Sequence, residues 1–312
     1  SVILVENAKT IYEIPVKLNQ QKLLKQLFCH FNLPQNKKIN LGLWENFLQK
    51  YYKLNNSVCV AIVGKYTNLS ESYKSLNEAL FHSGIYNNTK VEIKWVDSKK
   101  INSLKKCDSY FRGCNGILVP GGFGKDGTVG KLNAIKVSRK LKIPFLGICF
   151  GMQLAILDSI RSLNGFEKAS STEFGKTSLP VVSMIHEWKK NKKTLKHDTK
   201  NLGGSMRLGS YTAVIKKGTK VFSIYTKNKI NERHRHRYEV NYNYRNEIEK
   251  SGVTLSAVSP DGNLVEIMER NDHPWFLGVQ FHPELKSTPF NPHPIFNSFI
   301  KALIKNSENE KS

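Results

Sequence analysis

The stretch from residue 143 to residue 160 constrains the fold more than any other part of this sequence. An apolar run at 143–148 predicts a buried strand, and the apolar spacing at 152–160 predicts a helix. Between them, Gly147-Ile148-Cys149-Phe150-Gly151 has the glycine spacing of a sharp strand-to-helix turn that exposes its central side chain. The helix N-terminus favours a thiolate at Cys149. The alternative interpretation is a small apolar cysteine in a core strand.

Strands and helices alternate before this turn. Apolar runs and spacings predict strands at 58–64, 91–96 and 116–119 and helices at 70–82 and 131–140. This alternation favours an α/β fold with a doubly wound, mainly parallel sheet flanked by helices. Later in the chain the pattern changes to short strands at 181–185, 211–215, 254–258, 265–268 and 276–281, followed by a helix at 295–304. We therefore expect an additional, smaller antiparallel part that is rich in strands.

The two ends of the chain differ from its central region. Residues 1–19 predict an extended segment, and apolar spacing predicts helices at 21–31 and 43–51. Two helices and one strand are too little for an independent core, so we interpret residues 1–55 as the tail of an upstream domain plus linker helices. We assign residues 56–306 to the main domain and residues 307–312 to a polar tail.

Charge and cysteine content narrow the possible environments. The formal net charge is +23, but the basic residues are spread along the chain, and their densest run, at 189–200, predicts a solvated loop. We attribute the charge to composition and expect no specific nucleic-acid partner; sequence-independent nucleic-acid binding is the alternative. Five cysteines without a CxxC pair indicate a reducing, cytoplasmic location and no zinc site. No apolar run is as long as a membrane span, so we expect no membrane partner.

A second group of polar residues lies near the end of the chain, in the segment 280–284 (QFHPE). In a strand, side chains two residues apart share a face, which predicts that His282 and Glu284 lie together. A carboxylate beside an imidazole fixes its tautomer and supports its charged form. A thiolate needs such a base and orienting group, so Cys149, His282 and Glu284 are candidates for covalent catalysis. The alternative for His282 is a surface histidine at a strand end.

A glycine-rich turn at residues 121–124 (GGFG) follows the predicted strand at 116–119. Because the carboxyl ends of parallel strands share one edge of the sheet, we expect this turn to lie beside Cys149. A backbone amide from the turn would then join the amide of Phe150 to hold an oxyanion. The alternative is a phosphate-binding loop, but the GKS or GKT ending of that loop is absent.

Taken together, the 121–124 turn, the 147–153 segment and the 280–284 segment resemble the class I glutamine amidotransferase family. Members of that family hydrolyse glutamine to glutamate and ammonia through a Cys-His-Glu triad. The resemblance implies that Cys149 is the nucleophile, His282 the general base and Glu284 its orienting group, with no metal ligand. It also implies oxyanion-hole amides at Gly121 and Phe150, glutamine-binding positions at Gly122, Gln153, Glu173 and Arg237, and lid positions that respond to GTP at Phe123 and Arg207.

Further segments resemble one branch of this family, at residues 11–15, 61–66, 171–174, 203–209 and 232–241. In that branch the glutaminase follows a synthetase domain that uses the ammonia to aminate UTP to CTP. The resemblance implies a homotetrameric whole enzyme that uses ATP and Mg²⁺ and is activated by GTP, and it implies no cofactor in this chain itself. The expected partners are L-glutamine and the synthetase domain of the same polypeptide. The alternatives are a glutaminase of another amidotransferase, a γ-glutamyl hydrolase and a non-catalytic interaction module.

Overall fold

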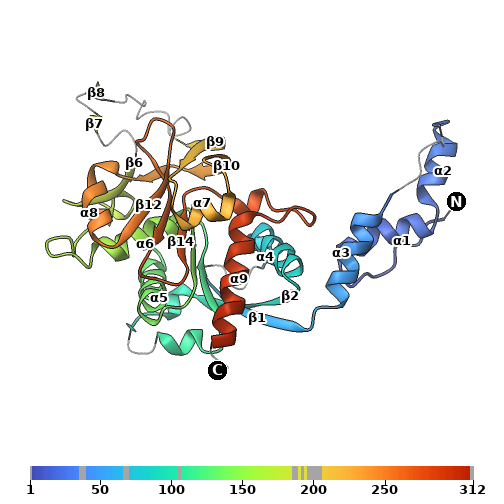
Figure 1. The fold of residues 1–312 in the computed structure, drawn as a ribbon, viewed down its shortest axis with the longest axis horizontal. Coiled ribbons are helices and arrows are strands. Elements are labelled where there is room, and N and C mark those ends of the chain that lie inside the picture. The colour runs from blue at the N-terminus through green and yellow to red at the C-terminus, as the bar shows by residue number, and fades with distance from the viewer. Residues whose placement is uncertain are drawn as a thin grey trace.

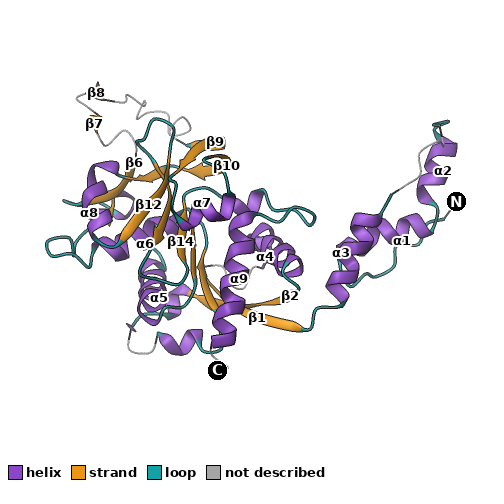
Figure 2. Cartoon of the chain, viewed as in Figure 1, coloured by secondary structure: helices purple, strands orange, loops and turns teal. Residues whose placement is uncertain are grey.

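The computed structural model describes residues 2–34, 40–65, 70–104, 107–184, 189–190, 193–194 and 206–309. Figures 1 and 2 show the arrangement of its elements. The helices are α1 (Ile14–Gln20), α2 (Leu23–His30), α3 (Gly42–Tyr52), α4 (Lys74–Tyr86), α5 (Thr128–Leu141), α6 (Phe150–Ile160), α7 (Lys220–Tyr225), α8 (Arg245–Lys250) and α9 (Pro294–Asn309). The strands are β1 (Asn56–Gly64), β2 (Thr89–Asp97), β3 (Gly116–Val119), β4 (Phe145–Ile148), β5 (Ser170–Ser171), β6 (Pro180–Met184), β7 (Lys189–Lys190), β8 (Lys193–Thr194), β9 (Arg207–Ile215), β10 (Lys229–His236), β11 (Tyr238–Val240), β12 (Val253–Val258), β13 (Val265–Arg270) and β14 (Phe276–Val279).

A nine-stranded sheet carries the fold, in the order β10-β9-β12-β13-β14-β4-β3-β1-β2. Neighbours from β2 to β14 pair in parallel, and neighbours from β14 to β10 pair antiparallel. The expected α/β fold, with a parallel sheet flanked by helices, is confirmed. Most of the antiparallel strands extend this same sheet instead of forming a separate layer, because hairpins such as β12–β13 need no crossover helix. A smaller sheet contains β11, β6 and β5.

Both faces of the parallel strands are buried. Along β1, Val60 and Ile62 belong to a core with side chains of α4, α7 and α9, whereas Ala61 and Val63 belong to a core with side chains of α5 and α6. Burial on both faces explains why the strand sequence is a continuous apolar run. Helix α9, red in Figure 1, continues to Asn309 and so extends past its predicted end into the segment expected as a polar tail.

The N-terminal segment is helical at residues 11–20, where the sequence predicted an extended chain. A 3-10 turn, η1 (Ile11–Glu13), leads into α1, and Pro15 lies in the first turn of that helix, where a missing N–H removes no helical hydrogen bond. Tyr12 ties this segment to α4, since its hydroxyl lies 2.6 Å from both Glu78 Oε2 and His82 Nε2. The two helices predicted in this segment are confirmed as α2 and α3.

The lysine-rich run at 189–200 was expected to form a solvated loop. The run at 189–200 lies mostly outside the described residues, and its described part forms the short antiparallel pair β7–β8 instead of a loop.

Within the ranges that the structure describes, no helix combines the length and the apolar character needed to cross a membrane.

Candidate active site

The turn between β4 and α6 places Cys149 at the start of a helix. Its φ of 52° and ψ of −103° lie in a region that L residues rarely adopt, as in other nucleophiles held on strained turns. Two glycines make the turn possible: a Cβ on Gly151 would lie 2.1 Å from the Val119 carbonyl oxygen, and one on Gly147 would lie 2.8 Å from the Gly151 backbone. The Cys149 amide donates to the Val279 carbonyl at 2.6 Å. The predicted strand-turn-helix unit is therefore confirmed.

His282 and Glu284 lie just past the end of β14. The Nδ1–H of His282 donates to Glu284 Oε1 at 2.7 Å, so the predicted contact is present. Its cause differs from the prediction, which relied on alternation along a strand. The strand ends at Val279, and the 3-10 turn η10 (Pro283–Leu285) brings the carboxylate back towards the ring. The contact fixes the tautomer of His282 and leaves Nε2 for other chemistry.

The side chains of His282 and Cys149 are neighbours, and their charges influence each other. Burial lowers the pKa of His282, but the adjacent Cys149 and Glu284 side chains outweigh burial and raise this pKa to about 10. Nε2 of His282 is buried and makes no hydrogen bond within the described residues. The Cys149 thiol is nevertheless close enough to raise the pKa of the ring. The geometry thus suits an ion pair of thiolate and imidazolium.

The glycine turn at residues 121–124 packs against the same histidine. A Cβ on Gly121 would lie 2.7 Å from His282 Cε1, so only glycine fits beneath the ring. The amide of Phe150 is at the first position of α6, where helix geometry provides no intrahelical acceptor for the N–H. The structure thus brings Gly121 and Phe150, the two predicted oxyanion donors, to the Cys149–His282 pair.

A glutamine to which sequence reasoning gave no role contacts the nucleophile. Gln280 Nε2 donates to Cys149 Sγ at 3.7 Å, and Gln280 Oε1 accepts from Gln153 Nε2 at 3.2 Å. Gln153 Nε2 also donates to the Tyr238 carbonyl at 2.8 Å. Gln153, expected to contact glutamine, therefore uses its amide nitrogen within the protein. Gln280 was visible in the 280–284 segment, but no local pattern marks a contact with a turn more than a hundred residues away.

Glu173 reaches the glycine turn from a short 3-10 turn. Its Oε1 accepts from the Gly124 amide at 2.6 Å. Burial raises the pKa of Glu173 above its usual value, and the Gly124 amide, Lys65 and Lys131 oppose this shift. Lys65 Nζ donates to the Phe123 carbonyl at 2.8 Å and lies 5.9 Å from the centre of the Phe123 ring. That ring is 74% exposed, which is compatible with its predicted place in a lid.

Arg207, for which the resemblance implies a lid position, belongs to a buried polar network. It begins β9 with a buried side chain, and its guanidinium donates to Glu239 Oε1 at 2.9 Å and to Glu266 Oε1 at 2.8 Å. Two buried histidines of β10 lie in the same network, with His234 Nδ1 2.9 Å from His236 Nε2. Burial, followed by the charge of Arg207, lowers the pKa of His234 to about 2 and that of His236 to about 3. Both histidines are therefore neutral.

The remaining predicted positions lie close to these groups. A Cβ on Gly122 would lie 3.3 Å from Lys131 Nζ. Arg237 lies half-buried in the bend between β10 and β11, directly after His236, so the buried network supports the segment that carries it. Among the described residues, no group of three or more His, Cys, Asp or Glu side chains is placed to hold a metal ion.

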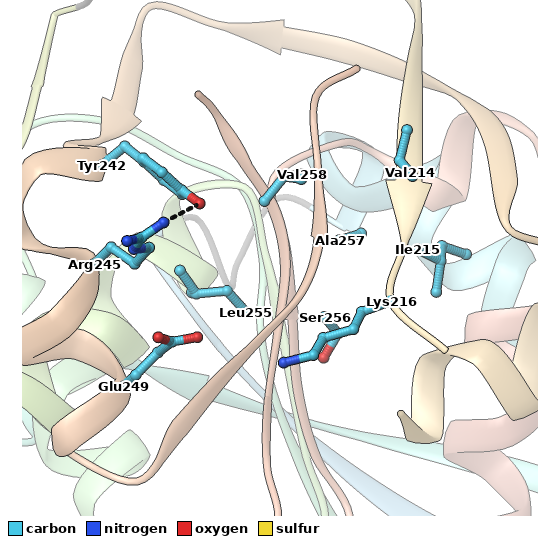
Figure 3. A pocket seen from close by; sticks show the side chains of 10 residues that line it. All are labelled: Val214, Ile215, Lys216, Tyr242, Arg245, Glu249, Leu255, Ser256, Ala257 and Val258. Carbon is cyan, nitrogen blue, oxygen red and sulfur yellow. Dashed lines mark hydrogen bonds between the residues drawn. The ribbon is translucent and has the colours of Figure 1, made fainter. Parts of the chain in front are cut away.

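A separate pocket lies between β9, β12 and α8 (Figure 3). Tyr242 and Arg245 line one side of it, where Arg245 Nη1 donates to the Tyr242 hydroxyl at 3.4 Å. Lys216 and Glu249 add charged groups, and aliphatic residues such as Leu255 form the rest of the lining. No residue of the candidate triad lines this pocket, so it plays no part in the chemistry considered above.

The strained cysteine, the His-Glu pair and the glycine turn occur together in a known family. The family described as glutamine amidotransferase class-I matches residues 68–302, which includes all three features. The match covers most of the chain, and the chain therefore belongs to the class I glutamine amidotransferase family.

Several similar proteins are CTP synthases. The chain is 46% identical to the CTP synthase of Parvibaculum lavamentivorans, over 98% of this chain and 57% of that protein. It is 48% identical to the CTP synthase of Acidiphilium cryptum, over 95% of this chain and 55% of that protein. It thus spans a little over half the length of these relatives. Among solved structures, it resembles the glutaminase domain of Trypanosoma brucei CTPS with bound acivicin, with 35% identity and a TM-score of 0.71 over 80% of this chain and 94% of that chain.

Proposed function

We propose that this chain is the glutaminase part of a CTP synthase and that it hydrolyses L-glutamine to glutamate and ammonia through Cys149, His282 and Glu284. The observation that carries this proposal is the meeting of the strained Cys149 turn with the His282–Glu284 pair at one edge of the sheet. The similarity to CTP synthases over nearly the whole chain supports the choice of this branch of the family.

The first half-reaction transfers the γ-glutamyl group to sulfur. The Cys149 thiolate attacks the side-chain carboxamide carbon of glutamine, and the amides of Gly121 and Phe150 hold the oxyanion that forms. His282 begins as the imidazolium, in keeping with its raised pKa, and gives its proton to the leaving nitrogen. The C–N bond then breaks, ammonia leaves and a thioester remains on Cys149.

The second half-reaction releases glutamate. Neutral His282 takes a proton from the water that attacks the thioester, the thiolate leaves and the imidazolium is restored. Glu284 holds the ring in one tautomer throughout both steps, because it accepts the hydrogen bond from Nδ1. The hydrogen bond from Gln280 to Sγ gives the thiolate a further donor.

We propose that Glu173 holds the ammonium of the substrate and Arg237 its carboxylate, with Gly122 and Gln153 completing the site. A carboxylate suits an ammonium group, and the planar fork of arginine suits a carboxylate. For Phe123 and Arg207 we propose a part in the response to GTP. Phe123 would act by direct contact, since its ring is exposed, and Arg207 would act through the buried network that supports Arg237.

In the whole protein, we propose that the ammonia passes to a synthetase domain that uses ATP and Mg²⁺ to aminate UTP to CTP. GTP would act as an activator, and the assembly would be a cytoplasmic homotetramer. This chain corresponds to a little over half of such a protein, so the CTP-forming activity belongs to the longer polypeptide. We expect the chain alone to form no CTP from ammonia, ATP and UTP, which chromatography of the nucleotides checks.

The test is intact-protein mass spectrometry after incubation with 6-diazo-5-oxo-norleucine, an electrophilic glutamine analogue. We expect a single adduct on Cys149 that excess glutamine prevents, and no adduct on the Cys149→Ala variant. An adduct elsewhere, or one that glutamine does not prevent, would contradict the assigned nucleophile and pocket. A folded chain that neither reacts nor releases ammonia from glutamine would favour the non-catalytic alternative.

A further inference from the structure

A buried lysine lies beneath the glycine turn of the site. Lys131 belongs to the first part of α5, and its side chain is only 2% exposed. Its Nζ lies 4.9 Å from the centre of the Phe150 ring and 3.3 Å from the place where a Cβ on Gly122 would be. Both contacts belong to segments that carry predicted oxyanion donors. The ammonium group is therefore positioned by the same elements that form the candidate active site.

Within the described residues, Lys131 has no ion-pair partner, which is unusual for a buried charge. No salt bridge joins its Nζ to a carboxylate of the described residues, and the Nζ instead lies over the ring of Phe150. A buried ammonium without an ion pair is costly, and a cation–π contact alone offsets only part of that cost. If this side chain served packing alone, Met or Leu would fill the position without the cost of a buried charge. The charge itself therefore calls for an explanation.

Charged groups of the candidate site, including the nucleophile, interact electrostatically with Lys131. Its charge interacts with Cys149 at the start of α6 and with Glu173, which is bound to the Gly124 amide on the far side of the turn. Lys65, after β1, is another cation near the turn. His282 is a third cation, next to Cys149. At the same end of α5, Lys99 and Asp126 are already paired with each other at 2.7 Å on the surface.

We propose that Lys131 is a positioning residue of this site. From beneath the glycine turn, its ammonium stabilises the thiolate of Cys149 and the oxyanion that forms above it. This inference rests on the proposed glutaminase function and deepens it. Lys131 does not need to touch the substrate. Because Lys131 and Cys149 are both buried, the positive charge acts on these anions more strongly than it would at a surface.

The inference predicts a specific dependence on pH. Burial, followed by the charge of Lys65, lowers the pKa of Lys131, and Glu173 and Cys149 oppose this; the result is a pKa of about 8. The ammonium is therefore present at pH 7 and is lost as the pH rises through about 8. The stabilising effect on the thiolate should fade over the same interval, which an arginine at this position would prevent because its guanidinium stays charged.

The experiment measures alkylation of Cys149 by iodoacetamide, followed on the Cys149 peptide by mass spectrometry, and glutamine hydrolysis, both from pH 6 to pH 10. For Lys131→Met we expect the alkylation rate at pH 7 and kcat to fall about tenfold, the general size of a nearby-charge effect, with KM changed less. Lys131→Arg should keep most of both rates and move the alkaline decline in glutamine hydrolysis from about pH 8 to about pH 10, where His282 loses its proton. Lys140→Met, on the exposed end of α5, removes the same charge as a matched control and should behave as the unmodified chain.

Each outcome decides the question. If Lys131→Met and Lys140→Met give the same rates and the same pH profile, the inference is wrong. If the Met and Arg variants fold but lose activity equally, the residue serves packing and not charge. Should Lys131→Met fail to fold, the shift of the alkaline decline from about pH 8 to about pH 10 in Lys131→Arg remains a direct test. Iodoacetamide needs no glutamine pocket, so a chain that is alkylated as described but hydrolyses no glutamine would refute the proposed function and leave the inference about Lys131 intact.

Discussion

A single methyl group at Gly121 should disable the histidine without unfolding the protein. In Gly121→Ala the new Cβ would lie 2.7 Å from His282 Cε1, and ordinary contacts begin near 3.4 Å, so the ring must retreat by about 0.7 Å. The ring cannot retreat freely, because its Nδ1 is bound to Glu284 at 2.7 Å. Gly121 is not among the residues with positive φ, so alanine causes no backbone strain.

The size of the effect follows from how sharply proton transfer depends on geometry. A displacement of about 1 Å in a catalytic group lowers rates by about 100-fold. We therefore expect kcat for glutamine to fall by about 100-fold, which corresponds to about 2.7 kcal/mol of transition-state stabilisation. The melting temperature should change by less than about 4 °C, since no buried contact other than that with the histidine is disturbed.

The assay compares Gly121→Ala with Gly122→Ala in ammonia release and in thermal unfolding. A Cβ on Gly122 would meet the flexible end of Lys131 at 3.3 Å, which can move aside, so we expect less than about a tenfold loss there. The reasoning would be refuted if the folded Gly121→Ala variant kept its kcat within about threefold of the unmodified chain.

Three further predictions concern stability. The pKa of His282 is raised from 6.5 to about 10, so its contribution to stability is complete below about pH 6.5 and is lost as the pH rises through 10. Because Glu284 is one cause of the raised pKa, Glu284→Gln should make the fall in melting temperature from pH 6 to pH 10 less steep. Differential scanning fluorimetry measures this fall. Arg207→Met should lower the free energy of unfolding by about 3–5 kcal/mol in urea titrations, because it leaves Glu239 and Glu266 buried without their partner, while Arg235→Met, on the exposed face of β10, should have little effect. Tyr12→Phe should cost about 1–3 kcal/mol and speed proteolysis within α1–α3, because Glu78 and His82 lose the hydroxyl; an unchanged cleavage rate would show that this contact does not hold the segment.

The failures of sequence reasoning have identifiable causes. Residues 1–19 were predicted as extended, but residues 11–20 are helical, and Pro15 is well tolerated in the first turn of a helix. The His282–Glu284 contact was predicted for the wrong reason, since a spacing of two also suits a 3-10 turn that starts with proline. The burial of Arg207 was not foreseen, because a charged side chain is usually exposed; only the approach of Glu239 and Glu266 makes its burial possible.

The sequence by itself determined the local parts of this protein. The glycines around Cys149, the apolar runs of the parallel strands and the adjacent His282 and Glu284 each act within a few residues, so spacing alone revealed them. Only the tertiary structure decided what meets across the sheet. The contact of Gln280 with Cys149, the burial of Lys131 beneath the glycine turn and the continuation of the antiparallel strands in the same sheet depend on which strands become neighbours. The physical reason is that these contacts join residues far apart in the chain, and their positions are fixed by strand order and packing, which no local pattern encodes.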